Sequence, residues 1–289
     1  MNAQILVNQV ESLFSLPEVA LRINEVLDSS DPLITELEDI IISDPALTAK
    51  ILKLVNSSFF GFPSSIDTIS RAITIIGFKE LRNLVMTTSV TNSFDGVPAG
   101  LVDMQVFWFH SVTSAVLAKI LAKKLKHTDY ERMFIAGLLH SVGRLIYFTQ
   151  CPDIAIEILA VKDLGEEAII AAEQEKLGFT YADLSTELLK RWELPVNIYQ
   201  VIHHHLEPLS AGEFTRDACV LHVASKIAGS IEPCAKSDFN LAEIEPYFKE
   251  DVLSYLQLSS DEIQSCIDDA FMQSFDILLA INPEAASIF

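Results

Sequence analysis

The sequence has few basic residues and no long apolar segment. Its 289 residues contain 20 lysines and arginines against 40 aspartates and glutamates, so the formal net charge is -20. Phosphate backbones and anionic membrane surfaces are bound by clustered cations, which this composition does not favour. No apolar run approaches the roughly 18 residues of a membrane span, and the N-terminus lacks the basic residues of a secretory signal. We therefore expect a cytoplasmic protein that binds neither nucleic acid nor membrane.

Glycine and cysteine are also sparse. The four cysteines are scattered without a CxxC pair, which indicates reduced structural thiols rather than a metal or redox site. Only 10 glycines are present, and the apolar residues recur at spacings of three and four, which is typical of helices. With 50% hydrophobic residues, the chain can form a packed core. We predict an all-α protein.

Residues 95–100 are the best candidate for a boundary, because two glycines and a proline stand there between two helical stretches. We predict an N-terminal helical subdomain over residues 1–98, packed on a second subdomain over residues 99–289. The second subdomain ends in an acidic helical extension, since residues 232–289 hold 12 acidic and 2 basic residues. A solvated helical face explains this charge, and a surface for a basic partner is the alternative.

Two local signals organise the N-terminal part. Asp44 before Pro45 predicts a helix start, because the aspartate can accept hydrogen bonds from the following N–H groups. Gly77 predicts a tight turn between two helices. A strand over residues 73–76 is the competing interpretation, since these residues are mostly β-branched.

The histidines are the residues most indicative of chemistry. All seven lie in the second subdomain, and six of them are on predicted helices: His110, His140, His203, His204, His205 and His222. His140 stands in a helix predicted over residues 131–148, where Ala136, Gly137 and Gly143 share its face. Such small residues allow another helix or a ligand to approach closely. The histidines are either core residues satisfied by hydrogen bonds or members of one site to which separate helices contribute. We expect His110, His140 and at least one of residues 203–205 to lie close together.

Several segments in order resemble the bacterial HDOD family, the HD-related output domains. They are LPEVA (16–20), DPALTAKILKLVNS (44–57), residues 72–85, FWFHS (107–111), AGLLHSVGRL (136–145), ELLKRWELP (187–195) and HHH (203–205). The resemblance covers roughly residues 12 to 230. It implies a helical bundle packed on an HD-like helical subdomain, which is similar to that of metal phosphohydrolases.

The resemblance also implies a pocket that lacks its carboxylates. In HD-type enzymes a first His, a His-Asp pair and a distant Asp hold the metal. His110 and His140 match the two histidines, but Ser141 and Ser225 stand where the aspartates belong, and Tyr181 replaces a further His. A His-His pair of some relatives matches either 203 with 204 or 204 with 205. The implied degenerate pocket comprises His110, His140, Ser141, Arg144, His204, His205 and Ser225.

We therefore expect a non-catalytic signal-transduction protein without catalytic residues, metal or cofactor, whose partner is another signalling protein. The sequence is compatible with a homodimer. The alternative is a metal-dependent phosphohydrolase with an altered ligand set, since neutral imidazoles can still bind zinc or nickel. A third interpretation is DNA binding by residues 70–85, where Arg71, Lys79 and Arg82 against Glu80 give a local net charge of +2. A packed helix pair explains the same residues.

Overall fold

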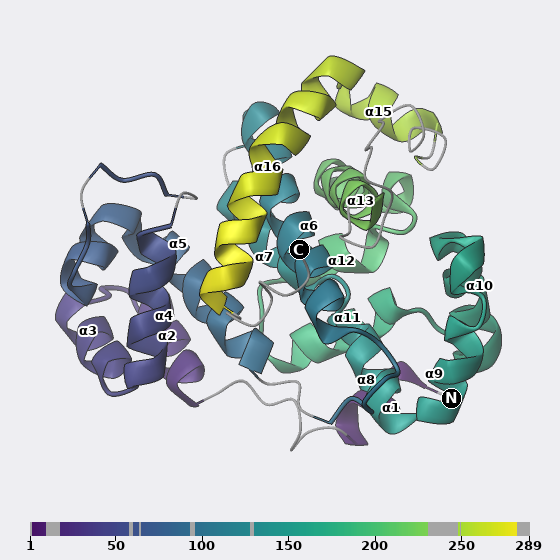
Figure 1. Cartoon of the computed structure of the whole chain (residues 1–289), viewed down its shortest axis with the longest axis horizontal. Helices are drawn as coiled ribbons and strands as arrows, with labels where there is room; N and C mark the ends of the chain where they lie inside the picture. The colour runs from purple at the N-terminus through teal and green to yellow at the C-terminus, as the bar shows by residue number, and fades with distance from the viewer. Residues whose placement is uncertain are drawn as a thin grey trace.

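The computed structural model describes residues 2–9, 18–57, 60–63, 65–92, 96–127, 130–230, 248 and 250–281. These residues form helices and no strand, which confirms the predicted all-α class (Figure 1). The helices are α1 (Ala3–Gln9), α2 (Glu18–Asp28), α3 (Ile34–Ile42), α4 (Pro45–Val55), α5 (Ile69–Asn92), α6 (Met104–Lys124), α7 (Tyr130–Leu139), α8 (Val142–Gln150), α9 (Pro152–Leu159), α10 (Glu166–Leu177), α11 (Tyr181–Arg191), α12 (Val196–His204), α13 (Thr215–Ser230), α15 (Glu250–Leu256) and α16 (Ser260–Ile281), with short 3-10 turns at Lys162–Leu164, Pro208–Ser210 and Gly212–Phe214.

The N-terminal bundle consists of α2 to α5. Its helix α4 begins as predicted, because the Asp44 carboxylate accepts hydrogen bonds from the N–H groups of Ala46 at 3.0 Å and Leu47 at 3.1 Å. Helix α5 is bent at Gly77, whose φ of 79° lies in the left-handed region that glycine adopts readily. The predicted helix, turn and helix are therefore present, and the competing strand over residues 73–76 is not.

Helix α6 is the central helix of the second half. Contrary to the expectation that no apolar segment approaches the length of a membrane span, this helix is long and apolar enough to cross a membrane by length and composition alone. However, residues on every side of it are buried in the protein, from Trp108 to Ala122. Helices α7, α13 and α16 pack around it. A helix that is apolar all round and covered by protein is a core helix.

The prediction of a single helix over residues 131–148 is wrong in the middle of this range. Helix α7 ends at Leu139 and α8 begins at Val142, so the chain turns at His140 and Ser141. The Ser185 hydroxyl donates to the carbonyl oxygen of His140 and accepts from the N–H of Gly143, each at 2.8 Å. These bonds satisfy backbone groups that the interruption removes from the helical ladder.

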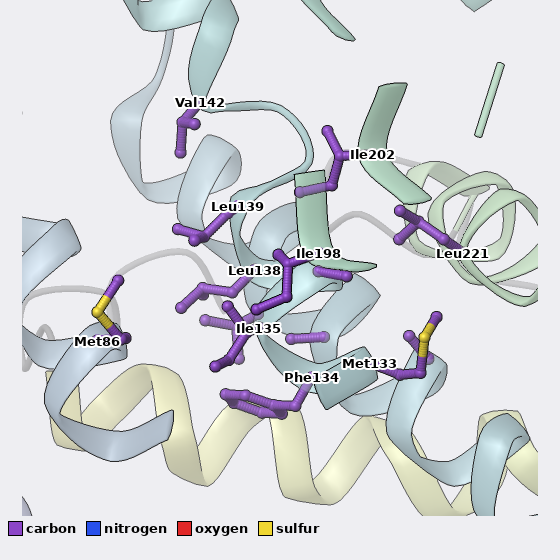
Figure 2. Packing of buried hydrophobic residues seen from close by; sticks show 14 of the residues in the cluster. Met86, Met133, Phe134, Ile135, Leu138, Leu139, Val142, Ile198, Ile202 and Leu221 are labelled. Atoms are coloured by element: carbon purple, nitrogen blue, oxygen red, sulfur yellow. The ribbon is translucent and has the colours of Figure 1, made fainter. Parts of the chain in front are cut away.

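One apolar core joins the two halves at α7. Figure 2 shows the labelled α7 residues among side chains from other helices. The side chains from other helices include Met86 of α5, Ile198 and Ile202 of α12, and Leu221 of α13. Helix α5 also contacts α7 directly, and α16 contacts α4, α5 and α6 (Figure 1).

The division at residues 98 and 99 stays a prediction. Helix α1, although it comes first in the chain, packs on α8 and α11 of the second half. Asp95 of the predicted boundary lies outside the described residues, as do residues 231–247 and 282–289 of the acidic extension. Cys151, Cys219 and Cys266 form no disulfide, and Cys234 also lies outside the described residues.

Candidate functional site

His140 stands at the turn between α7 and α8 and is completely buried. Its Nδ1 lies 2.6 Å from the carbonyl oxygen of Gly137, which can only accept, so Nδ1 carries the proton. Nε2 of the neutral ring is then an acceptor, and it lies 3.2 Å from Nε2 of His110. His110 consequently donates in this pair. Burial lowers the pKa of His140 well below its ordinary value, and the neighbouring imidazoles of His110 and His205 lower it further.

His205 completes the cluster from the end of α12. It is completely buried, and its ring centroid lies 5.5 Å from that of His140. Nδ1 donates to the carbonyl oxygen of Ile202 at 2.6 Å, and Nε2 accepts from the Tyr181 hydroxyl at 2.9 Å. Burial lowers the pKa of His205 to about 4. The structure therefore brings together His110, His140 and His205, which we call the histidine cluster.

His204, which the resemblance also places in the pocket, is not part of the histidine cluster. It lines a surface pocket together with His203, and the two rings lie 4.7 Å apart. Successive residues of a helix point about 100° apart. At the end of α12, His205 faces the core, and His204 therefore points in a different direction. Burial and the neighbouring His203 lower the pKa of His204.

Ser141 and Ser225, which the resemblance places at the positions of two aspartates, engage in local hydrogen bonds. The Ser141 hydroxyl lies 3.2 Å from the Ser111 hydroxyl. The Ser225 hydroxyl donates at 3.1 Å to the carbonyl oxygen of His222, one helical turn earlier. The His222 ring in turn donates from Nδ1 to the carbonyl oxygen of His205 at 2.8 Å. These contacts hold α6, α12 and α13 around the histidine cluster.

A buried ionic network lies behind the cluster. The Arg144 guanidinium carbon is 4.0 Å from the centre of the Tyr181 ring. Its nitrogens lie 3.3 Å from Glu166 and 3.7 Å from Glu173. Glu173 is completely buried and accepts hydrogen bonds from the Tyr147 hydroxyl at 2.9 Å and the N–H of Tyr181 at 2.8 Å. We call Arg144, Glu166, Glu173 and Lys226 the ionic network.

The charges of this network shift its pKa values in opposite directions. Burial raises the pKa of Glu173 despite the nearby Arg144. Burial also opposes ionisation of Glu166, but Arg144 and Lys226 lower its pKa well below the usual range, and the Lys226 ammonium lies 3.0 Å from its carboxylate. Sequence reasoning missed both carboxylates. A signal existed for Glu173, which stands four residues before the buried Leu177 on the same face of α10.

Comparisons with known proteins identify this arrangement. A family profile described as "HDOD domain" matches residues 13–208. The chain belongs to the HDOD family. This confirms the resemblance drawn from the sequence motifs, and the HDOD region contains His110, His140, Tyr181 and His205.

Individual relatives agree with this assignment. An uncharacterized protein of Treponema pallidum (strain Nichols) is 25% identical over 210 residues, which are 71% of this HDOD chain and 40% of that protein. The chain therefore spans about two fifths of the length of this curated relative. A Shewanella amazonensis SB2B protein, provisionally named a phosphohydrolase, superposes with a TM-score of 0.77 at 25% identity and covers 96% of this chain and 97% of its own. A Marinobacter aquaeolei VT8 protein, provisionally named a signal transduction protein, has a TM-score of 0.69 at 22% identity over 97% of this chain and 61% of its own.

The donor atoms around the histidine cluster do not fit the metal centre of an HD-type phosphohydrolase. Only the Nε2 atoms of His110 and His140 face one another, while Nε2 of His205 is hydrogen-bonded to Tyr181. The nearby carboxylate of Glu166 is paired with Arg144 and Lys226. Among the residues that the structure describes, no three His, Cys, Asp or Glu side chains are arranged to hold a metal ion.

The buried neutral histidines predict acid sensitivity. The pKa of His205 in the folded protein is about 4, below its ordinary value of 6.5. The unfolded chain therefore binds the proton first, so this contribution to stability is complete above the ordinary pKa and is lost as the pH falls through it. Between about pH 7 and about pH 5 we expect His205 to account for a loss of roughly 2 kcal/mol in the free energy of unfolding.

Urea unfolding of His205→Gln at the two pH values measures this loss. We expect the variant to be less stable than the wild type at neutral pH but to lose roughly 2 kcal/mol less on acidification. His203→Gln is the matched control, because His203 is exposed and adjacent, and we expect it to retain the wild-type pH dependence. Equal pH dependence of all three proteins would show that His205 is not held neutral by burial.

Proposed function

We propose that this protein is a non-catalytic regulatory member of the HDOD family, which acts through contacts with another signalling protein and retains a degenerate HD pocket. The observation that carries the proposal is the engagement of the pocket's polar atoms with one another. Ser141 is bonded to Ser111, Ser225 to a backbone carbonyl, and His205 to Tyr181. The pocket thereby links α6 to the start of α8, and α11 to the end of α12.

The chemistry of phosphoester hydrolysis supports the same proposal. A hydrolytic metal must polarise a phosphoryl oxygen and lower the pKa of a bound water. Carboxylate ligands offset the charge of such an ion and orient its solvent. Ser141 and Ser225 supply neutral hydroxyls in their place, and the neutral imidazoles of the cluster leave the ionic charge uncompensated.

One observation favours the alternative, a phosphohydrolase with an altered ligand set. The Nε2 atoms of His110 and His140 lie 3.2 Å apart. Two imidazole nitrogens that bind one tetrahedral zinc ion are separated by about 3.3 Å. The same pair could therefore share a proton or an ion, and solution measurements distinguish the two.

We expect the purified protein to contain no stoichiometric divalent metal and to hydrolyse neither nitrophenyl phosphate, bis-nitrophenyl phosphate nor nucleotides, with or without added manganese, nickel or zinc. Elemental analysis and product release measure this. His140→Ala serves as the reference for background activity, because it removes one half of the imidazole pair. A stoichiometric metal together with activity that His140→Ala abolishes would establish the phosphohydrolase instead.

We infer the chemistry of the partner from the charge of the chain. With a net charge of -20, the chain is repelled by nucleic acids, and a protein partner with a basic surface is electrostatically favoured. A second copy of this acidic chain is compatible with the proposal only at a face where the charges are paired.

A further inference from the structure

A groove of about 300 Å³ lies between the N-terminal bundle and the second half. Helices α2 and α5 line one side, and α7 and the start of α12 line the other. The lining residues are Leu27, Phe78, Lys79, Arg82, Asn83, Glu131, Arg132, Ile135, Pro195, Asn197 and Ile198. Pockets at domain interfaces are common sites for small molecules, which usually occupy roughly 300–1,000 Å³.

The interior of this inter-half groove is apolar. Leu27 and Phe78 come from the N-terminal bundle and are partly buried, while Ile135 and Ile198 are buried in the shared core. Figure 2 shows Ile135 of α7 and Ile198 of α12 next to one another. Since both belong to the packed core, this wall of the groove is held in place without a ligand.

The charged residues of the groove are mostly basic, although the protein as a whole is strongly acidic. Lys79, Arg82 and Arg132 line it against a single acidic residue, Glu131. Arg82 lies 2.6 Å from Asp28, whose side chain is 68% exposed. The Arg82 side chain is 22% exposed, so an incoming anion can reach its guanidinium and replace the exposed carboxylate of Asp28 there. Arg132 is held in position by Asp217 at 2.5 Å.

Amide groups supply further polar atoms. Asn83 donates at 3.2 Å to the carbonyl oxygen of Glu131 and so links the two sides of the groove. The Oδ1 atom of Asn197 is buried and makes no hydrogen bond with any described residue. A buried polar atom without a partner is costly. Because Oδ1 is an acceptor, it would be satisfied by an N–H or O–H group on the body of a ligand and not by its anionic group.

We propose that the inter-half groove binds a small organic anion, in which a carboxylate, phosphate or sulfonate is attached to an apolar body. The apolar interior takes the body, and Lys79 and Arg82 take the anionic group. This combination of an apolar cavity with a few converging polar groups is typical of ligand sites. Because both halves line the groove, the bound anion stabilises their contact. The inference does not depend on the function proposed for the histidine cluster.

Two fluorescent probes of similar shape test the proposal. Anilinonaphthalene sulfonate carries an anionic group on an aromatic body, and phenylnaphthylamine has the aromatic body without the anion. We expect both to bind the wild-type protein. The double variant Lys79→Gln/Arg82→Gln should bind the sulfonate about tenfold more weakly, because charge-assisted hydrogen bonds are lost, and should bind the neutral probe unchanged.

Two further variants complete the experiment. Arg22→Gln removes an exposed cation of α2 that does not line the groove. This variant should bind both probes with wild-type affinity. Leu27→Trp fills the groove and should weaken both probes, with thermal unfolding used to confirm that each variant is folded. The proposal is overturned if the wild type binds no sulfonate, if the double variant binds it as tightly as the wild type or loses both probes equally, or if Leu27→Trp binds both normally.

Discussion

Replacement of Gly143 by alanine is expected to destabilise the protein by about 3 kcal/mol, because the added methyl group has no space. A Cβ atom at Gly143 would lie 2.2 Å from the carbonyl oxygen of Tyr181 and 2.5 Å from the backbone nitrogen of Ser185. Both are backbone atoms of α11, so α8 and α11 must separate. For a chain of this size the midpoint of thermal unfolding should fall by roughly 5 °C.

Gly229→Ala is the matched control for this substitution. Its Cβ would meet only the His110 ring, at 3.7 Å, which is ordinary van der Waals contact. Alanine is the better helix former, so this variant should be as stable as the wild type or more stable by up to about 1 kcal/mol. If the two variants unfold at the same temperature, close packing of α8 on α11 is not what requires glycine at residue 143.

Replacement of Arg144 by methionine should cost about 3 to 5 kcal/mol, because it leaves the buried carboxylate of Glu173 without its cation. Glu173 is completely buried, and Arg144 is its cationic partner at 3.7 Å. Chemical denaturation at neutral pH measures the loss. Lys190→Met is the control, because this exposed lysine forms an ion pair with Glu187 three residues earlier on the same helix and lies 5.7 Å from the centre of the Tyr199 ring, and we expect the change to alter stability by less than about 1 kcal/mol.

The same variant has a distinctive pH dependence. Burial already raises the pKa of Glu173, and removal of the guanidinium raises it further. A carboxyl group whose pKa is higher in the folded than in the unfolded state favours folding when it is protonated. The deficit of Arg144→Met should therefore shrink as the pH falls from about 7 towards about 5. Addition of Glu173→Gln should recover part of the loss at neutral pH. A deficit that is constant with pH and unaffected by the second substitution would contradict an electrostatic cause.

Sequence patterns predicted the inward histidines but could not assign the run at 203–205. His110 and His140 lie among residues with clear helical spacing, and both reached the cluster. Three adjacent histidines at the end of a short helix carry no such periodicity, and the structure selected His205 rather than His204. The small residues around His140 allow close packing of helices, because Gly137 lies against α6 and Gly143 lies against α11.

The sequence by itself determined the helical class and the HDOD family, because these follow from residue identity and local spacing. The tertiary structure decided what depends on distant partners. The helical period continues through His140 and Ser141, yet the chain turns there because Ser185, more than forty residues later, satisfies the released backbone groups. Similarly, in the sequence Glu166 and Glu173 resemble surface residues of an acidic helix. In the folded protein they contact Arg144, Tyr181 and Lys226. Burial of a charge is stable only when its partners are already in place, and no local pattern records where those partners will be.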